Sequence, residues 1–252
     1  MPTNLTVLPV RKLPEPTGAT KGKQKRRKLD PRLPGSMGDG KFKPFLLVIS
    51  APVSSGKTNL LMALLYQDTL LRDIFDEIMY ISPTIENDAT GWPAMKDEEV
   101  VKITENLGQI DLILESIVEI QRAKDDKERG HTLIVLGDCL GLIKTSGHSY
   151  FSTLCSKYRH WKISIIVTTQ NFRAIPVTAR YNASNYIIFK TNNRKELDKM
   201  EEELDGNFPF LEVYDAATDN RYNFLHLDME EIKAYKNFDE LVYEKFAGKT
   251  KK

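Results

Sequence analysis

The stretch from residue 45 to residue 65 combines a strand pattern with a helix pattern. The uninterrupted apolar run Phe45–Ile49 is typical of a buried strand. A polar, turn-rich segment follows it, and leucines then recur at helical spacing at positions 60, 61, 64 and 65. The sequence therefore predicts a strand, a loop and a helix that runs from Lys57 to about Asp68.

Apolar runs and helical periods alternate along much of the remaining chain. The strands that we expect are Asp76–Ser82, Thr132–Asp138, Ile163–Gln170 and Asn185–Thr191. The helices that we expect are Leu107–Lys127, Tyr150–Tyr158 and Arg194–Leu204. The polar stretch Thr84–Glu99 predicts an irregular excursion. This alternation predicts an α/β protein with three layers and a largely parallel central sheet.

The C-terminal part has weaker patterns. Phe210–Tyr214 and Tyr222–Leu227 predict a final strand pair around an Asp219-Asn220 turn. A helical spacing then predicts a C-terminal helix, with the inward positions Phe238, Leu241, Val242 and Phe246. We expect three regions: a flexible arm at 1–40, the main domain at 41–228, and a C-terminal helix with a basic tail at 229–252.

Composition limits the class of protein. The chain has 252 residues, 41% of them hydrophobic, which suits one α/β domain with extensions. No apolar run approaches the roughly 18–20 residues of a membrane span. The N-terminus lacks the apolar core of a secretory signal. The two cysteines, Cys139 and Cys155, lack metal-binding spacing, so we expect a reducing, intracellular setting.

Charge is unevenly distributed, although the net charge is only +1. Residues 1–43 carry eleven Lys/Arg and three Asp/Glu, whereas the remainder carries 25 and 32. The tract Lys21–Lys28 is suited to neutralising nucleic-acid phosphates, and a nuclear-localisation signal or a solvated tail fits it equally well. It contains no aromatic residue for stacking on bases, which argues against base-specific recognition.

The loop after the first strand has the composition of a phosphate-binding loop. Its residues are Ala51, Pro52, Val53, Ser54, Ser55, Gly56, Lys57 and Thr58. Gly56 allows the backbone to approach phosphates, Lys57 can reach the β- and γ-phosphates, and Thr58 can offer its hydroxyl to Mg²⁺. Ala51 departs from the usual first glycine. The flanking strand and helix favour an ATP site over a chance Gly-Lys-Thr.

The third strand ends at the candidate acid. Nucleotide hydrolysis needs a carboxylate for Mg²⁺ and a group that orients water. Gly137 stands directly after the apolar run, where an acid is usual, and Asp138 comes one residue later. Asp138 is therefore either the catalytic carboxylate without a separate metal acid, or the metal ligand itself through flexing at Gly137. A third possibility is that Asp138 caps the next element.

Three further polar residues are candidates. Gln170 ends the fourth strand and is suited to sensing the γ-phosphate or holding water, although a strand-end turn residue is a simple alternative. Arg159 precedes that strand and Arg180 follows it. An arginine that reaches a neighbour's γ-phosphate contributes roughly 10³–10⁵ in rate, but most arginines are surface groups.

Taken in order, these motifs resemble the genome-packaging ATPases of nucleocytoplasmic large DNA viruses and virophages, within the FtsK–HerA superfamily of P-loop ATPases. The resemblance covers roughly Lys43–Leu204. The stretches that carry it are Ser50–Thr58, Met79–Thr84, Leu133–Cys139, Arg159-His160, Ile166–Gln170 and Ile175–Ser184. It implies a RecA-like P-loop NTPase fold of the ASCE class at 41–228. The family usually has two acids where this chain has Gly137-Asp138.

The resemblance also implies a function. It implies an ATP- and Mg²⁺-dependent motor that forms a homo-oligomeric ring and moves double-stranded DNA into a preformed viral capsid. An arginine from a neighbour would complete each site, with Arg180 the first candidate and Arg159 the second. The expected locations are the host cytoplasm, at virus factories, and the virion.

Two other functions remain open. A ring-forming assembly factor that binds nucleotide without turnover is favoured by Gly137. A small-molecule or nucleotide kinase is disfavoured by the order of the Gln170 and Arg180 motifs.

Overall fold

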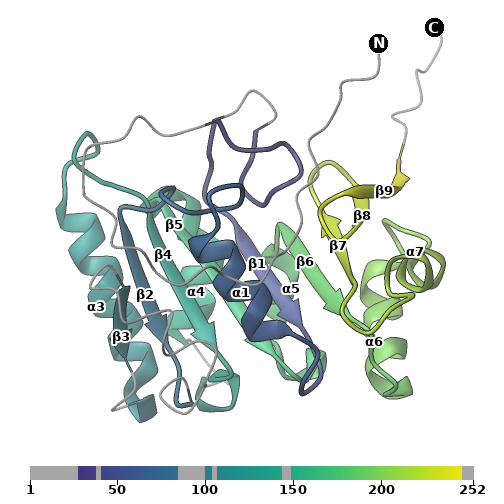
Figure 1. The fold of residues 1–252 in the computed structure, drawn as a ribbon. Coiled ribbons are helices and arrows are strands. Elements are labelled where there is room, and N and C mark those ends of the chain that lie inside the picture. Colours follow the sequence, from purple (N-terminus) through teal and green to yellow (C-terminus); the bar gives the residue numbers. More distant parts are fainter. Residues whose placement is uncertain (1–27, 38–40, 85–99, 104–106, 144–148, 246–252) are drawn as a thin grey trace, which may run out of the picture.

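The computed structural model describes residues 28–37, 41–84, 100–103, 107–143 and 149–245. Its described strands form one sheet of nine, in the order β3-β2-β4-β5-β1-β6-β7-β8-β9 (Figure 1). The parallel strands are β1 (Leu46–Ser50), β2 (Glu77–Ile81), β3 (Val100–Ile103), β4 (Thr132–Gly137), β5 (Ile163–Thr169) and β6 (Asn185–Phe189). An antiparallel extension consists of β7 (Phe224–Asp228), β8 (Lys233–Lys236) and β9 (Glu240–Glu244).

Helices cover both faces of the sheet, which gives three layers. The α-helices are α1 (Lys57–Tyr66), α3 (Ile110–Ala123), α4 (Tyr150–Lys157), α5 (Val177–Asn182), α6 (Arg194–Leu204) and α7 (Phe210–Ala217). Short 3₁₀ turns are η2 (Leu107–Gln109), η3 (Leu140–Leu142), η4 (Tyr158–Trp161) and η5 (Phe172–Ala174). Helix α1 packs on one face, and helices α3 to α7 contribute to the core on the other.

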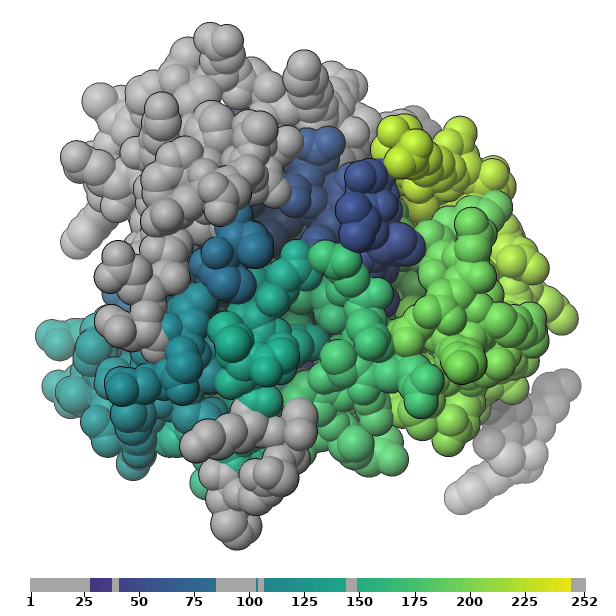
Figure 2. Space-filling view, turned by 90° about the horizontal axis from the view of Figure 1, so that it is seen from below, coloured from purple at the N-terminus to yellow at the C-terminus, as the bar shows by residue number. Residues whose placement is uncertain are grey.

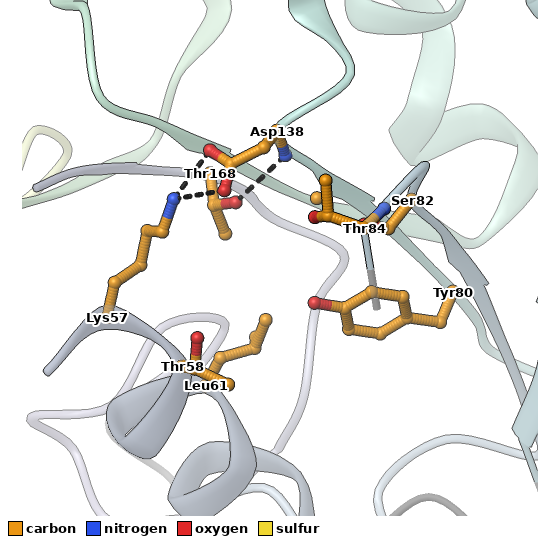
Figure 3. Close-up of a pocket in the computed structure, with 9 residues that line it drawn as sticks. Lys57, Thr58, Leu61, Tyr80, Ser82, Thr84, Asp138 and Thr168 are labelled. Atoms are coloured by element: carbon orange, nitrogen blue, oxygen red, sulfur yellow. Dashed lines mark hydrogen bonds and ion pairs between the residues drawn. The ribbon is translucent and has the colours of Figure 1, made fainter. Parts of the chain in front are cut away.

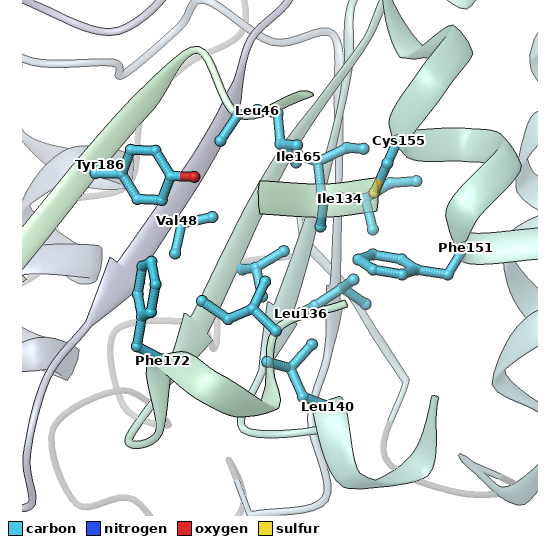
Figure 4. Close-up of a cluster of buried hydrophobic side chains, with 14 of the residues drawn as sticks. Leu46, Val48, Ile134, Leu136, Leu140, Phe151, Cys155, Ile165, Phe172 and Tyr186 are labelled. Carbon is cyan, nitrogen blue, oxygen red and sulfur yellow. The ribbon is translucent and has the colours of Figure 1, made fainter. Parts of the chain in front are cut away.

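Alternation along the strands explains why both faces are apolar. In β1, Leu46 and Val48 belong to the core under α3 to α7, whereas Leu47 and Ile49 belong to the core under α1. The larger core includes aromatic and aliphatic side chains from β4, β5, α4 and η5 (Figure 4). Strands buried on both faces need apolar residues at every position, which is why they read as unbroken hydrophobic runs. The three-layer α/β prediction is confirmed.

The strand predicted at Phe210–Tyr214 is wrong, because these residues begin helix α7. The buried residues of α7 are Phe210, Val213, Tyr214 and Ala217, which have helical spacing. Pro209 stands at its N-cap, and the carboxylate of Asp205 accepts a hydrogen bond from the Phe210 N–H at 3.2 Å. The predicted strand at Tyr222–Leu227 corresponds to β7, which pairs with β6 and β8.

The predicted C-terminal helix is also wrong, because β8 and β9 form a hairpin there. Asn237 adopts a positive φ of 56° in the turn, a conformation that asparagine tolerates. Its N–H donates to the carbonyl of Phe224 at 2.8 Å, and its side-chain oxygen accepts from the Phe224 N–H at 3.2 Å. Pairing with the edge of the sheet therefore outweighs the local helical pattern.

Part of the segment assigned to a flexible arm packs on the domain. Leu29 and Leu33 are buried in the core under α1, and Arg32 pairs with Asp30, with Nε and Oδ1 2.9 Å apart. The prediction of an arm is therefore wrong for residues 29–36, because their leucines cover apolar surface beside α1. Residues 1–27, which include the basic tract up to Arg27, and most of the predicted excursion at 84–99 lie outside the described residues.

Candidate functional site

The phosphate loop joins the end of β1 to the start of α1. Gly56 has a φ of 96° and Ser54 has a φ of 58°, so the loop needs the left-handed region twice. The Ser55 hydroxyl donates to the Pro52 carbonyl at 2.7 Å, and the Ala51 N–H donates to the carbonyl of Thr169 at 2.9 Å. The first bond closes the loop on itself, and the second holds the loop against the end of β5. Ala51, which replaces the usual glycine, is buried in the core.

Lys57 and Asp138 meet although they are 81 residues apart. The Lys57 Nζ lies 2.5 Å from both carboxylate oxygens of Asp138 (Figure 3). Asp138 has a φ of 51°, and its N–H donates to the Thr168 hydroxyl at 3.3 Å. The carboxylate therefore points to the phosphate loop. This orientation argues against the alternative that Asp138 only caps the next turn.

A pocket surrounds this pair at the carboxyl ends of β2, β4 and β5. Its lining residues are Lys57, Thr58, Leu61, Tyr80, Ser82, Thr84, Gly137, Asp138 and Thr168 (Figure 3). Figure 2 views the molecule from this edge of the sheet. Four of these residues had not been predicted as site residues: Tyr80, Ser82, Thr84 and Thr168. Their positions at strand ends were a usable signal, because polar residues that end parallel strands gather at one edge of a sheet.

Gly137 is enclosed by β2. A Cβ added to Gly137 would lie 3.1 Å from the Cβ of Ser82 and 3.1 Å from both Cε1 and the hydroxyl oxygen of Tyr80. The Tyr80 side chain thus occupies the space into which a side chain at position 137 would extend. This packing explains in physical terms why glycine stands at the end of the apolar run of β4.

The donor atoms of the pocket are suited to Mg²⁺. They comprise the Asp138 carboxylate and the hydroxyls of Thr58, Ser82 and Thr84, all of them oxygen. Mg²⁺ commonly binds through one or two carboxylates together with substrate phosphates and water. In the part of the chain that the structure describes, no group of three or more His, Cys, Asp and Glu residues is arranged for a metal. The residues therefore fit a nucleotide-linked Mg²⁺ better than a protein-only metal site.

The nearby cysteine contributes packing rather than chemistry. Cys139 is fully buried directly after Asp138, and Cys155 is buried in the same core. Burial raises the pKa of the Cys139 thiol to about 12, with a smaller contribution from the Asp138 charge. Both thiols therefore remain protonated near neutral pH, which excludes a thiolate nucleophile.

Gln170 lies at the same edge of the sheet as the pocket. Strand β5 runs between β1 and β4, so its end stands beside both the phosphate loop and Asp138. The Gln170 side chain is exposed and is not part of the pocket lining. The structure thus brings Gln170 near Lys57 and Asp138 without a contact between them.

Arg159 and Arg180 lie at the opposite edge of the sheet. Arg159 belongs to η4, which precedes β5, and Arg180 belongs to α5, which precedes β6. Both line a separate groove of about 710 Å³ that also includes Glu203 and Glu230. The seven residues of β5 span roughly 20 Å. Neither arginine can therefore reach the phosphate pocket of its own chain.

The two arginines differ in exposure. The Arg159 side chain is 52% exposed, and its Nη2 donates to Glu230 at 2.6 Å. The Arg180 side chain is 10% exposed, and its Nη1 donates to the Ile175 carbonyl at 2.6 Å. Its Nε lies 2.7 Å from a Glu203 oxygen, an ion-pair distance without hydrogen-bond geometry. Arg180 is thus tied into its own chain, whereas Arg159 is accessible.

Within the described residues, no helix has the length and apolarity needed to cross a bilayer.

The fold resembles that of viral packaging enzymes. B204, the DNA-packaging ATPase of Sulfolobus turreted icosahedral virus, superposes with a TM-score of 0.61 over 78% of this chain and 98% of B204, at 14% identity. The genome-packaging NTPase B204 of Sulfolobus turreted icosahedral virus 2, in complex with ATPγS, gives a TM-score of 0.58 over 77% and 96%, at 15% identity. These likenesses establish a P-loop NTPase fold.

Sequence comparison gives the family. The uncharacterized protein 075L of invertebrate iridescent virus 6 is 23% identical over 195 residues, which cover 72% of this chain and 69% of that protein. The family model of the poxvirus A32 protein matches residues 39–206. This range is most of the chain and contains the phosphate loop, Asp138, Gln170 and both arginines. The chain therefore belongs to the poxvirus A32 protein family of P-loop ATPases.

Proposed function

We propose that this chain is an ATP-driven motor that moves double-stranded DNA into a viral capsid. The observation that carries the proposal is the separation of the phosphate pocket from the arginine groove. Asp138 and Lys57 lie at one edge of the sheet, whereas Arg159 lies at the other. A head-to-tail ring would bring the groove of one subunit to the pocket of the next, because such interfaces join two different surfaces.

Each residue has a role in this proposal. Lys57 binds the β- and γ-phosphates, Thr58 and Asp138 hold Mg²⁺, and Gln170 senses the γ-phosphate. Mg²⁺ supplies charge neutralisation for the transferred phosphoryl group. Arg159 reaches the neighbour's phosphates, because it is the more exposed of the two arginines. Arg180 holds α5 in place.

The name of B204 and the uneven charge of this chain support the DNA part of the proposal. B204 is described as a DNA-packaging ATPase. Residues 1–43 of this chain carry a net charge of +8, which is suited to salt-dependent contact with DNA phosphates. The host cytoplasm is the location that we propose, on the resemblance to the packaging ATPases of nucleocytoplasmic large DNA viruses alone.

A nucleotide-binding assembly factor without turnover is the second candidate. It is favoured by Gly137, because the chain has one acid where the resembling ATPases have two, and Tyr80 fills the adjacent space. In such a factor ATP would favour ring formation and phosphate would not be released.

Phosphate release by the purified full chain distinguishes the two candidates. We expect release that rises on addition of double-stranded DNA and that is lost in Lys57→Ala. ATP binding and ring formation without release would favour the assembly factor. Release that is the same with and without DNA would contradict the DNA motor while leaving an ATPase.

A further inference from the structure

The turn between α7 and β7 lies against the phosphate loop. Arg221 Nη2 donates to the Ser54 carbonyl at 3.1 Å, although the two residues are 167 positions apart. A Cβ added to Gly56 would lie 3.5 Å from Cδ1 of Tyr222, so the Tyr222 ring stands beside the glycine of the loop. Tyr222 is nevertheless 62% exposed. An aromatic ring with most of its surface open thus flanks the candidate ATP site.

The turn is held by the C-terminal hairpin. Lys236 Nζ donates to Asp219 Oδ2 at 2.6 Å, and this bond is the main reason that the pKa of Asp219 is lowered. Asn223 Nδ2 donates to the other Asp219 oxygen at 2.8 Å, and Asn237 Nδ2 donates to Asn223 Oδ1 at 3.2 Å. The position of Tyr222 is therefore fixed by hydrogen bonds from both sides of the turn.

The direction of a bound nucleotide follows from the order of strands. Lys57 reaches toward Asp138 at the end of β4, so the γ-phosphate belongs on the β4–β5 side of the loop. The triphosphate would extend across the loop, so the nucleoside is expected to lie on the other side of β1. That side holds β6 and β7, and Tyr222 stands two residues before β7.

We propose that Tyr222 is the platform on which the nucleobase of the bound triphosphate stacks. Arg221 is a positioning residue, because it ties the turn to Ser54 and its guanidinium carbon lies 5.5 Å from the centre of the Tyr222 ring. The inference rests on the proposed nucleotide site and deepens it. Both residues lie beyond residues 39–206, the range that the family model matches.

The chemistry predicts the kind of selectivity. Every nucleobase has a π-face, so stacking on a tyrosine discriminates weakly between bases. The loss of Tyr222 is therefore expected to weaken the binding of ATP and of GTP to a similar extent. Binding of a ligand that has phosphates but no base is expected to be unaffected.

Calorimetric titration of the full chain with a non-hydrolysable ATP analogue and with inorganic tripolyphosphate tests the proposal. Lys57→Ala supplies the blank for non-specific binding of either ligand to the basic N-terminal region. We expect Tyr222→Ala to raise the Kd of the analogue roughly tenfold, because a base–aromatic stack is lost. The Kd of tripolyphosphate should stay within about twofold of the wild-type value. Tyr222→Phe keeps the ring and should bind like the wild type.

The control is Ile120→Ala, because Ile120 is 55% exposed on α3 and lines neither the phosphate pocket nor the arginine groove. Equal weakening of both ligands by Tyr222→Ala would overturn the proposal, since the ring would then act on the shape of the phosphate loop. Unchanged binding of the analogue would overturn it as well. If the wild type binds the analogue but releases no phosphate from ATP, the motor proposal is rejected and the stacking proposal is kept. If the wild type binds neither ligand above the blank, both proposals are rejected.

Discussion

The ammonium of Lys57 lies 2.5 Å from each oxygen of the Asp138 carboxylate, so the two groups neutralise each other at the mouth of the phosphate pocket. A nucleotide phosphate that engages Lys57 must compete with this carboxylate. In the mechanism that we propose, binding of the nucleotide would release Asp138 to hold Mg²⁺ or orient water. The contact connects the two motifs that define the site.

Asp138→Asn is expected to separate binding from hydrolysis. The amide has no charge to hold Lys57, so ATP without Mg²⁺ should bind at least as tightly as it does to the wild type. Phosphate release should fall about 10²-fold or more, because the acid is lost. Binding by calorimetry and steady-state phosphate release measure the two effects. Asp125→Asn, at an exposed surface position, is the control, and wild-type turnover in Asp138→Asn would remove this residue from the mechanism.

Gly137→Asp is expected to destabilise the protein rather than restore a second acid. Its Cβ would lie 3.1 Å from atoms of Tyr80 and Ser82, and crowding of this kind costs about 1–3 kcal/mol. The melting temperature should fall by roughly 2–4 °C per kcal/mol. Gly141→Asp is a matched control, because a Cβ there meets no atom within 4 Å.

The double variant Tyr80→Leu with Gly137→Asp tests the cause of this loss. Shortening the side chain at position 80 removes the two Tyr80 atoms that crowd the new Cβ and leaves the Cβ of Ser82, so the double variant should recover part of the lost stability. If the double variant loses as much stability as Tyr80→Leu and Gly137→Asp lose together, Tyr80 is not the source of the strain.

Mixed rings test whether Arg159 acts between subunits. Arg159→Ala should lower phosphate release roughly 10³-fold or more, and Lys57→Ala should abolish it. In a mixture, a Lys57→Ala subunit still carries Arg159 and can complete the intact pocket of an Arg159→Ala neighbour. We therefore expect the mixture of two inactive proteins to recover activity. A mixture as inactive as its components would place Arg159 outside the site.

Arg180→Ala should act on stability instead. Its side chain is 10% exposed and donates to the Ile175 carbonyl, and its removal leaves Glu203, 15% exposed, without this cation. Loss of a partner of this kind costs about 1–3 kcal/mol. The melting temperature of Arg180→Ala should be compared with that of Arg159→Ala, which loses an exposed ion pair. Such pairs contribute only about 0–1 kcal/mol. Equal melting temperatures for the two variants would contradict the structural role of Arg180.

His226 is expected to make stability fall in mild acid. It is fully buried between Tyr235 and Phe238, and burial lowers its pKa to about 3 from the usual 6.5. Between these values the unfolded chain binds a proton that the folded chain does not, so this contribution is complete above pH 6.5 and is lost toward pH 3.

The loss assigned to His226 is about 2 kcal/mol between pH 7 and pH 5. His226→Gln removes the titrating group. The free energy of unfolding of this variant, measured with denaturant, should therefore fall about 2 kcal/mol less between pH 7 and pH 5 than that of the wild type. A variant with the same pH dependence as the wild type would show that folding does not lower the pKa of His226. The comparison uses differences between two pH values, so it tolerates a lower overall stability of the variant.

The hydrophobic pattern was sufficient for most of the sheet. Strands such as β4 and β5 are buried on both faces, so their apolar runs identified them without any knowledge of their neighbours. The edge elements were misjudged, because Phe210–Ala217 and Glu240–Glu244 have mixed patterns that suit either a helix or a strand. Their state is decided by contacts with the sheet.

Local sequence was enough to identify the phosphate loop, the central strands and Asp138, because each depends on residues that are adjacent in the chain. Three relationships became visible only in the folded chain: Tyr80 crowds Gly137, Arg159 and the phosphate pocket lie at opposite edges, and Tyr222 flanks Gly56. These relationships depend on which strands pair and in what order. Strand order is set by packing between segments far apart in the chain, which local periodicity does not encode.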